Sequence, residues 1–315
     1  MKYRPLGRTG LDVSILSYGA SSLGGVFHDI DESQGVRTVH EVLDLGINLI
    51  DVSPYYGLTK AETVLGKALR EIDRDRYILA TKVGRYGDDP SDFDFSADRV
   101  KASVDESLER LGVDHVDIIQ CHDIEFADFD YVMTEAIPAL REVVAAGKAK
   151  FVGVTGLPLT VFTKTMDRLG PDGFDTILSY CHFELNDTTL LPIARDFAEK
   201  GLGVINASPT GMGLLTERGA PDWHPAPESI KAVCQEAVEL CKSRGKQITD
   251  LAIAYAVSEP SIASTLVSSA NPANMRKNVA AAEAELDTEL LADVQRVLQP
   301  VMDQTWHSGR PEYAA

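Results

Sequence analysis

The sequence lacks long hydrophobic runs and paired cysteines. No stretch approaches the roughly 20 apolar residues that a membrane-spanning helix requires, and residues 1–10 contain no apolar segment that would direct export. The four cysteines, Cys121, Cys181, Cys234 and Cys241, include no CxxC pair, and the last two would lie roughly 10 Å apart on one helix, too far for a disulfide. We therefore expect a cytoplasmic protein with reduced thiols that does not associate with membranes.

Positive charge is also scarce, with 30 Lys and Arg against 48 Asp and Glu and a formal net charge of −18. Nucleic acids and anionic membrane surfaces would be repelled by such a chain, because their phosphates need cations to neutralise them. The acidic residues are spread along the sequence, which is typical of a solvated surface. We expect a small-molecule partner, no nucleic acid, and a monomer or small homo-oligomer.

No stretch rich in Pro, Gly or Ser divides the 315 residues, so we expect a single domain over residues 1–315. After a hairpin around residues 6–10, eight short apolar runs alternate with amphipathic helices. The strand candidates are residues 15–18, 48–50, 77–80, 116–120, 151–154, 175–178, 203–206 and 264–267. The helix candidates are residues 33–45 and 61–70, a helix capped by Ser96, residues 131–146, a helix through Phe162 and Leu169, and residues 189–200, 229–243, 250–258, 272–282 and 287–298.

Eight strand-helix units without a break predict an α/β fold, the closed (β/α)8 TIM barrel, with an N-terminal β-hairpin and an extra C-terminal helix. Every strand of a closed barrel has a neighbour on both sides, so no edge is left open. The alternative is an open doubly wound sheet. Its GxGxxG fingerprint should follow the first strand, but residues 19–25 do not contain it.

Four polar groups follow these strand candidates directly. Asp51 and Tyr56 follow the second candidate, Lys82 the third and His122 the fourth. Each residue alone is more often a structural or solvated side chain. The C-terminal ends of barrel strands share one face, however, and that face carries the active site, so we expect the four side chains to meet in one mouth.

A metal-dependent hydrolase is a second interpretation of the same mouth. The chain has seven His but no His-x-His pair, which favours a site with no metal. The alternative nevertheless stays open, because four potential metal ligands lie at the ends of two strand candidates: His122, Asp123, His182 and Glu184. A phosphate-loop NTPase is excluded more firmly, since no GxxxxGK[ST] motif occurs.

Tyr56 and Lys82 together indicate proton transfer. A phenol titrates near pH 10, and a nearby ammonium group stabilises the phenolate and lowers the pKa. Lys82, with Asp51 as its counter-ion, would supply that charge, and His122 could hydrogen-bond the substrate oxygen. Such a site exchanges a proton with a carbonyl or hydroxyl group, and it needs a partner that carries hydride.

The sequence resembles the aldo-keto reductase family nearly from end to end. The resemblance rests on Gly-x-Thr-Gly at residues 7–10, Asp51 and Tyr56 followed by Gly, Ala-Thr-Lys at residues 80–82, the strand that ends in His122, and Val-Gly-Val-Thr at residues 152–155. It implies an eight-stranded barrel that binds a nicotinamide cofactor at its C-terminal face. It also implies that Tyr56 is the general acid or base, that Lys82 and Asp51 tune it, and that His122 positions the substrate.

The cofactor positions depart from the family pattern. The family's Ser-Asn pair after strand five reads Thr155-Gly156, its Gln after strand six has no clear counterpart, and the aromatic residue that stacks on nicotinamide is replaced by Ala207. We expect Tyr180 or another aromatic residue to take its place. By the resemblance, cofactor contacts would come from Ala20, Ser21, Asp51, Thr155, Gly156, Ser179, Ser208, Thr210, Gly211, Met212, Gly213, Ser268, Ser269, Asn274 and Asn278.

Cofactor preference follows from two missing cations. NADP-specific members of the family carry Lys and Arg where this chain has Ser268 and Asn274, because two cations compensate the dianionic 2′-phosphate. We therefore predict NAD as the preferred cofactor, with NADP possible because Arg276 and Lys277 lie close by.

Residues 154–159 and 178–183 are similar to a subgroup of the family that oxidises free aldoses at C1 to lactones. The resemblance implies a sugar of the L-galactose, L-fucose or D-arabinose type, and polar groups would bind it. The candidates are Tyr56, His122, Asp123, His182, Trp306 and His307. Two alternatives stay open: a general NADPH-dependent aldehyde or ketone reductase, and a nucleotide-binding regulatory subunit with little turnover.

Overall fold

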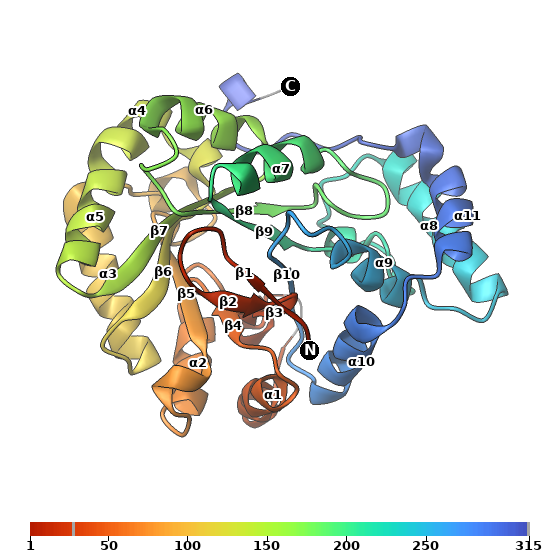
Figure 1. The fold of residues 1–315 in the computed structure, drawn as a ribbon, viewed down its shortest axis with the longest axis horizontal. Coiled ribbons are helices and arrows are strands. Elements are labelled where there is room, and N and C mark those ends of the chain that lie inside the picture. The colour runs from red at the N-terminus through yellow and green to blue at the C-terminus, as the bar shows by residue number, and fades with distance from the viewer. Residues whose placement is uncertain (27–28, 314–315) are drawn as a thin grey trace.

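Eight parallel strands close into a barrel in the computed structural model, which describes residues 1–26 and 29–313 (Figure 1). The strands follow one another around the ring in chain order, and β10 pairs with β3 to close it. The predicted barrel is therefore confirmed. Its strands are β3 (Leu16–Gly19), β4 (Leu49–Asp51), β5 (Ile78–Val83), β6 (Val116–Cys121), β7 (Ala149–Gly156), β8 (Thr176–Tyr180), β9 (Gly203–Ala207) and β10 (Ser264–Val267).

The predicted N-terminal hairpin consists of β1 (Tyr3–Pro5) and β2 (Asp12–Ser14), paired antiparallel. It closes the end of the barrel opposite the C-terminal ends of the strands, because Leu6 from its turn packs in the interior core. Gly7 in this turn has a φ of +54°, and a Cβ there would lie 2.4 Å from the backbone nitrogen of Gly203. Only glycine allows the turn to approach β9 so closely.

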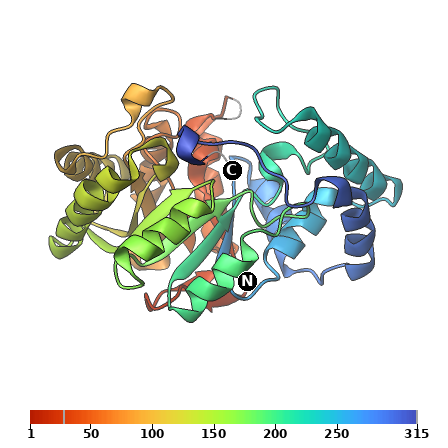
Figure 2. The same ribbon diagram turned by 90° about the horizontal axis from the view of Figure 1, so that it is seen from above.

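Helices cover the outside of the barrel and alternate with its strands (Figures 1 and 2). The last helix is the extra one that the sequence predicts, and it packs against α8 in a second apolar cluster away from the barrel. The helices are α1 (Glu32–Asp44), α2 (Lys60–Leu69), α3 (Ala97–Leu111), α4 (Phe129–Tyr131), α5 (Ile137–Ala145), α6 (Thr160–Leu169), α7 (Leu191–Glu199), α8 (Glu228–Ser243), α9 (Ile248–Ala256), α10 (Pro272–Glu283) and α11 (Thr288–Leu298).

The alternation of side chains along each strand sets the depth of every residue in the barrel. Leu49, Ala80 and Ile118 belong to the apolar cluster in the interior. Two residues further along the same strands stand Asp51, Lys82 and Gln120, which join in hydrogen bonds. The barrel interior is therefore apolar toward the N-terminal ends of these strands and polar at their C-terminal ends.

The local predictions differ from the structure in three places. Asp51 and Lys82 lie within β4 and β5 rather than after them. The helix predicted over 131–146 starts earlier, at Phe129, and contains a π-helical turn at Val132–Ala136, because Pro138 has no N–H to continue the regular ladder. Ser96 stands at the N-cap of α3 without a side-chain capping bond.

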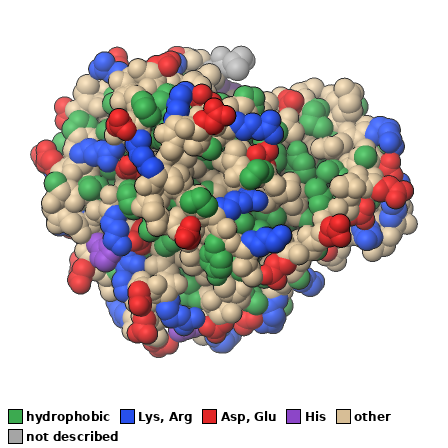
Figure 3. Space-filling view, in the orientation of Figure 1, with side chains coloured by type: hydrophobic (Ala, Val, Ile, Leu, Met, Phe, Trp, Pro, Cys, Tyr) green, Lys and Arg blue, Asp and Glu red, His purple; other side chains and the backbone are tan. Residues whose placement is uncertain are grey.

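All four cysteines are buried and unpaired. On the face drawn in Figure 3, acidic and basic side chains are interspersed rather than gathered into areas of one sign. Within residues 1–26 and 29–313, no helix has both the length and the apolar character that crossing a bilayer requires.

Candidate active site

Lys82 lies at the centre of a buried polar chain. Only 1% of the residue is exposed, and its Nζ forms an ion pair with Asp51 Oδ1. The same Nζ donates to the carbonyl oxygen of Val52 at 3.0 Å and to Tyr56 Oη at 3.1 Å. The second carboxylate oxygen of Asp51 accepts from Gln120 Nε2 at 2.8 Å. The ammonium group is thus fixed by three acceptors, of which the phenol oxygen faces the mouth.

Tyr56 is held by a close contact between two loops. A Cβ on Gly57, which has a φ of +61°, would lie 2.1 Å from the carbonyl oxygen of Gly24, and a Cβ on Gly24 would lie 2.6 Å from the carbonyl oxygen of Tyr56. Both glycines therefore let the loop after β4 pack directly on the loop after β3. This packing fixes the backbone from which the phenol reaches Lys82.

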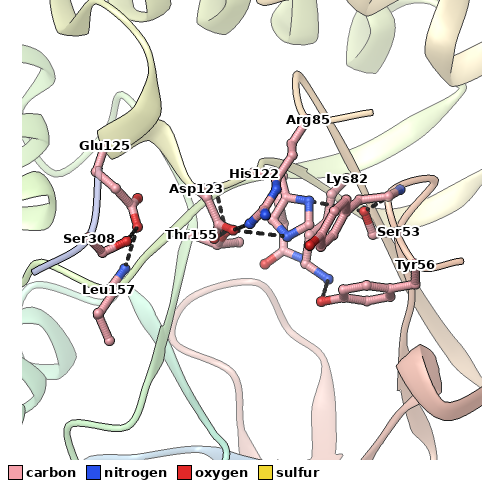
Figure 4. A network of polar contacts seen from close by, with 12 residues as sticks. Ser53, Tyr56, Lys82, Arg85, His122, Asp123, Glu125, Thr155, Leu157 and Ser308 are labelled. Carbon is pink, nitrogen blue, oxygen red and sulfur yellow. Dashed lines mark hydrogen bonds and ion pairs between the residues drawn. The ribbon is translucent and has the colours of Figure 1, made fainter. Parts of the chain in front are cut away.

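His122 follows β6 and is almost completely buried. Its Nδ1 lies 3.0 Å from Ser53 Oγ in a hydrogen bond. Its ring stands edge-on to the rings of Tyr55 and Tyr56, with both centroid distances at 5.7 Å. Figure 4 shows His122 beside Tyr56 and Ser53. The imidazole and the phenol therefore flank one position at which a substrate oxygen could sit.

Asp123 carries a second ion pair next to this imidazole. Its Oδ2 lies 2.5 Å from Arg85 Nη1 and 3.6 Å from His122 Nε2, and its Oδ1 accepts from Thr155 Oγ1 at 3.2 Å. The Arg85 guanidinium stacks on Tyr55 at 3.7 Å from the ring centroid. The ion pair with Arg85 therefore holds the Asp123 carboxylate in place beside His122 (Figure 4).

The electrostatics of this chain differ from the sequence prediction in one respect. Burial raises the pKa of Tyr56, and the positive charge of Lys82 offsets only part of that rise. Burial disfavours the charged form of Lys82, but the charges of Asp51 and Tyr56 outweigh it and raise the pKa of the ammonium group. Lys82 therefore stays charged and acts on the Tyr56 pKa in the predicted direction, but burial outweighs it and leaves that pKa above its ordinary value.

His122 behaves differently, since burial lowers its pKa to about 3. The charge of Asp123 opposes this shift, while the charges of Lys82 and Arg85 add to it. The imidazole is therefore neutral at physiological pH, with one N–H and one bare nitrogen.

Backbone strain is concentrated at the same end of the barrel. Residues other than glycine rarely adopt positive φ, and such strain clusters at functional sites. Here all but one of the described examples lie in loops that follow β4, β6, β8 and β9, and the remaining one, Asp303, hydrogen-bonds Thr188 near β8. The residues are Leu58, Thr59, Asp123, Cys181, Ser208, Met212 and Asp303.

The residues predicted to bind the cofactor lie at or after the C-terminal ends of β3, β4, β7, β8, β9 and β10, with Asn274 and Asn278 inside α10. Ser268 links two of these ends, since its Oγ accepts from Ser21 Oγ at 3.0 Å and from the Ser22 backbone N–H at 3.1 Å. Ser269 and Asn274 are joined by a hydrogen bond of 3.3 Å at the start of α10. The remaining predicted positions are Ala20, Asp51, Thr155, Gly156, Ser179, Ser208, Thr210, Gly211, Met212, Gly213 and Asn278.

Among the predicted substrate contacts, Asp123 lies next to His122, but three others have different neighbours. His182 is buried, and its Nδ1 lies 2.9 Å from Thr189 Oγ1. Trp306 packs edge-on against His224, with ring centroids 4.9 Å apart, and His307 is exposed. None of the described contacts joins these three to Tyr56 or His122.

The sequence reasoning missed four residues at the site: Ser53, Arg85, Gln120 and Glu125. Gln120 had a usable signal, because an amide inside an apolar strand must find a buried partner. Ser53 lies only two residues from Asp51 and could have been noticed for that reason. Arg85 and Glu125 gave no local signal, since their partners Asp123 and Ser308 are distant in sequence.

Glu125 connects the mouth to the C-terminal tail. Its Oε1 accepts from the Leu157 backbone N–H at 3.0 Å and from Ser308 Oγ at 3.1 Å, and its carbonyl oxygen accepts from the Arg310 N–H at 2.9 Å. Burial and the negative charge of Asp123 raise the Glu125 pKa to about 8. The tail therefore crosses the C-terminal end of the barrel after α11, as Figure 2 shows.

The metal alternative has no geometric support in residues 1–26 and 29–313. His122 and Asp123 face Ser53 and Arg85, while His182 faces Thr189. No group of three or more His, Cys, Asp or Glu side chains in this part of the chain is arranged to hold an ion.

Comparisons with known proteins agree with this geometry. A model described as "Aldo/keto reductase family" matches residues 15–299. The chain is 50% identical to L-galactose dehydrogenase of Arabidopsis thaliana over 315 residues, covering 98% of both proteins. It is 33% identical to D-arabinose 1-dehydrogenase of Saccharomyces cerevisiae, covering 78% of this chain and 76% of that protein. The solved holo form of aldo-keto reductase AKR11C1 from Bacillus halodurans superposes with a TM-score of 0.76, at 26% identity and 98% coverage of both chains.

Proposed function

The chain belongs to the aldo/keto reductase family of oxidoreductases, and on that premise we propose that it is an NAD-dependent dehydrogenase that oxidises a free aldose at C1. The observation that carries the proposal is the chain from Asp51 through Lys82 to Tyr56 Oη, which ends at the mouth beside His122. The similarity to two sugar 1-dehydrogenases supports the choice of substrate.

The residues around the mouth suit a nicotinamide dinucleotide, which would supply the hydride acceptor. Ser179 Oγ, at the end of β8, is buried without a hydrogen-bond partner in the part of the chain that the structure describes. Tyr180 stands next to it, in register with Ala207 on β9. We assign Tyr180 the place of the stacking aromatic residue, with Thr155 and Ser179 as hydrogen-bonding groups nearby.

NAD is preferred over NADP because the adenosine end offers few cations. Ser268 is occupied by Ser21 and Ser22, and Asn274 is uncharged. Arg276 lies 2.7 Å from Glu41 in an ion pair and is therefore already neutralised. The two positions that would face a dianionic 2′-phosphate by the family resemblance therefore carry no cation to balance its charge.

The substrate enters as the cyclic hemiacetal, with its C1 hydroxyl between Tyr56 and His122. Tyr56 in its phenolate form takes the proton of that hydroxyl, and a bound NAD would supply the acceptor for the hydride that leaves C1. The C1–O bond becomes the carbonyl of a lactone. Lys82 stabilises the phenolate before the transfer, and Asp123 and Arg85 are placed to accept and donate hydrogen bonds to ring hydroxyls.

A panel of sugars and cofactors on the purified protein tests the proposal. We expect turnover of L-galactose, L-fucose or D-arabinose with NAD, and lower kcat/KM with NADP. Reduction of a simple aromatic aldehyde by NADPH without sugar oxidation would favour the general reductase. Cofactor binding without turnover of any compound would favour the regulatory subunit.

A further inference from the structure

Ser53 is the only polar neighbour of His122 Nδ1 that the described residues place within hydrogen-bond distance. Its side chain is fully buried, so its hydroxyl hydrogen must find an acceptor inside the protein. Its oxygen already accepts the backbone N–H of Tyr55 at 3.1 Å. The hydroxyl therefore donates to Nδ1, which must be the bare nitrogen of the neutral imidazole.

The opposite side of the ring leads to the same assignment. Asp123 Oδ2 lies 3.6 Å from His122 Nε2. A lone pair on Nε2 would face the lone pairs of a carboxylate, whereas an N–H there points a positive hydrogen at it. Burial alone would raise the Asp123 pKa, but the charge and the hydrogen bond of Arg85 help to hold it below its ordinary value, so the carboxylate is charged.

We propose that Ser53 is a positioning residue that fixes His122 as the Nε2–H tautomer, with the braced carboxylate of Asp123 acting from the other side. Its consequence for catalysis rests on the proposed function: the Nε2–H donates to the substrate C1 oxygen beside Tyr56. A separation of 3.6 Å is too long for a strong bond between Nε2 and Asp123. Arg85 and Thr155 hold the carboxylate in place, so the N–H remains available.

The tautomer can be measured without any substrate. Two-bond proton-nitrogen NMR correlations on protein labelled with ¹⁵N-histidine distinguish the two tautomers, and the His122 signals are those that disappear in His122→Gln. We expect a protonated Nε2 and a hydrogen-bonded, bare Nδ1 in the wild type. A proton on Nδ1 would overturn the proposal. This result is independent of the proposed function, because it needs neither sugar nor cofactor.

Two matched variants separate the hydroxyl from the space it fills. In Ser53→Ala the Nδ1 resonance should lose its hydrogen-bond shift and kcat for the sugar should fall by about tenfold, with KM for NAD unchanged. Ser53→Thr keeps a hydroxyl and should restore both readouts. An unchanged Nδ1 resonance in Ser53→Ala, or equal loss in both variants, would contradict the role of the hydroxyl. If no variant or wild type turns over a sugar, the proposed function fails while the NMR result still stands.

Discussion

The two halves of the barrel mouth differ in charge. The half from β4 to β7 contains Asp51, Lys82, Arg85 and Asp123, all buried or half-buried and joined in ion pairs. The predicted cofactor positions on β8, β9, β10 and β3 present only hydroxyl, amide, thioether and backbone groups. On the proposed function, fixed charge lies where the proton would move, whereas the predicted cofactor positions are uncharged.

One buried acidic group near the predicted cofactor positions, Glu184, also carries little charge. Glu184 lies behind Gly211, where a Cβ would be 3.0 Å from its Oε2. Burial and the charge of Asp187 raise the Glu184 pKa to about 8. The carboxyl group is therefore mostly protonated at neutral pH and adds little negative charge beside the predicted cofactor positions.

The largest effect should come from removing the phenol. Tyr56→Phe deletes the group that exchanges the proton, so kcat should fall by about a thousandfold while the dissociation constant for NAD stays the same. Steady-state kinetics and a fluorescence titration with NAD measure the two quantities. Tyr55→Phe is the control, because its hydroxyl bonds Asp88 at the surface and should change kcat little. Near-normal activity of Tyr56→Phe would show that the phenol in the charged half does not exchange the proton.

The next largest effect tests the charge of the first half. Lys82→Met leaves Asp51 buried without its ammonium partner, which should cost about 3–5 kcal/mol in the free energy of unfolding. Asp51→Asn/Lys82→Met removes both charges and should recover much of that loss. Urea unfolding curves measure both variants. Equal destabilisation of the single and double variants would show that packing, rather than charge, explains the result.

A third change adds charge to the neutral half. Ser268→Lys/Asn274→Arg supplies two cations for a 2′-phosphate, so the ratio of kcat/KM for NADP over NAD should rise about tenfold to a hundredfold. Glu41→Gln is the companion variant, because it frees Arg276 and should move the ratio in the same direction by less. A wild type that already prefers NADP would contradict the assignment.

The pH dependence sharpens the role of the charged half further. Because burial holds the Tyr56 pKa above its ordinary value, the phenolate is the minor form at neutral pH. Sugar oxidation needs that form, so kcat/KM should rise by about tenfold per pH unit between about 7 and 9. A pH profile with saturating NAD measures this. A plateau already reached at pH 7 would show that Lys82 outweighs burial.

The smallest effect is expected for Glu125→Gln, at the border of the two halves, where the change should appear in thermal stability rather than in activity. The Glu125 pKa is about 8 when folded and near its ordinary 4.5 when unfolded, so between these values only the folded state keeps the proton. This group therefore makes the protein less stable as pH rises from 4.5 to 8. Glu125→Gln should raise Tm at pH 8.5 by a few degrees and change it least at pH 5. The exposed Glu109→Gln serves as the control, and an identical response of both variants would refute the assignment.

The sequence predicted the barrel and the four residues Asp51, Tyr56, Lys82 and His122, because strand periodicity and strand ends are local properties. It did not predict how Arg85 and Glu125 are used, since their partners depend on which loops meet at the mouth. The sequence also did not predict that the Tyr56 pKa is raised. The direction of this pKa shift depends on how completely the phenol is buried, which the presence of a nearby Lys does not reveal.

The seam between β10 and β3 has a consequence for how the protein is made. Thr265 pairs with Leu16 across it, and the ring cannot close before β10 has left the ribosome. Until then, β3 and β9 are open edges of an incomplete sheet, and such edges pair readily with other chains. A truncation before Ser264 should therefore leave both edges open and favour aggregation.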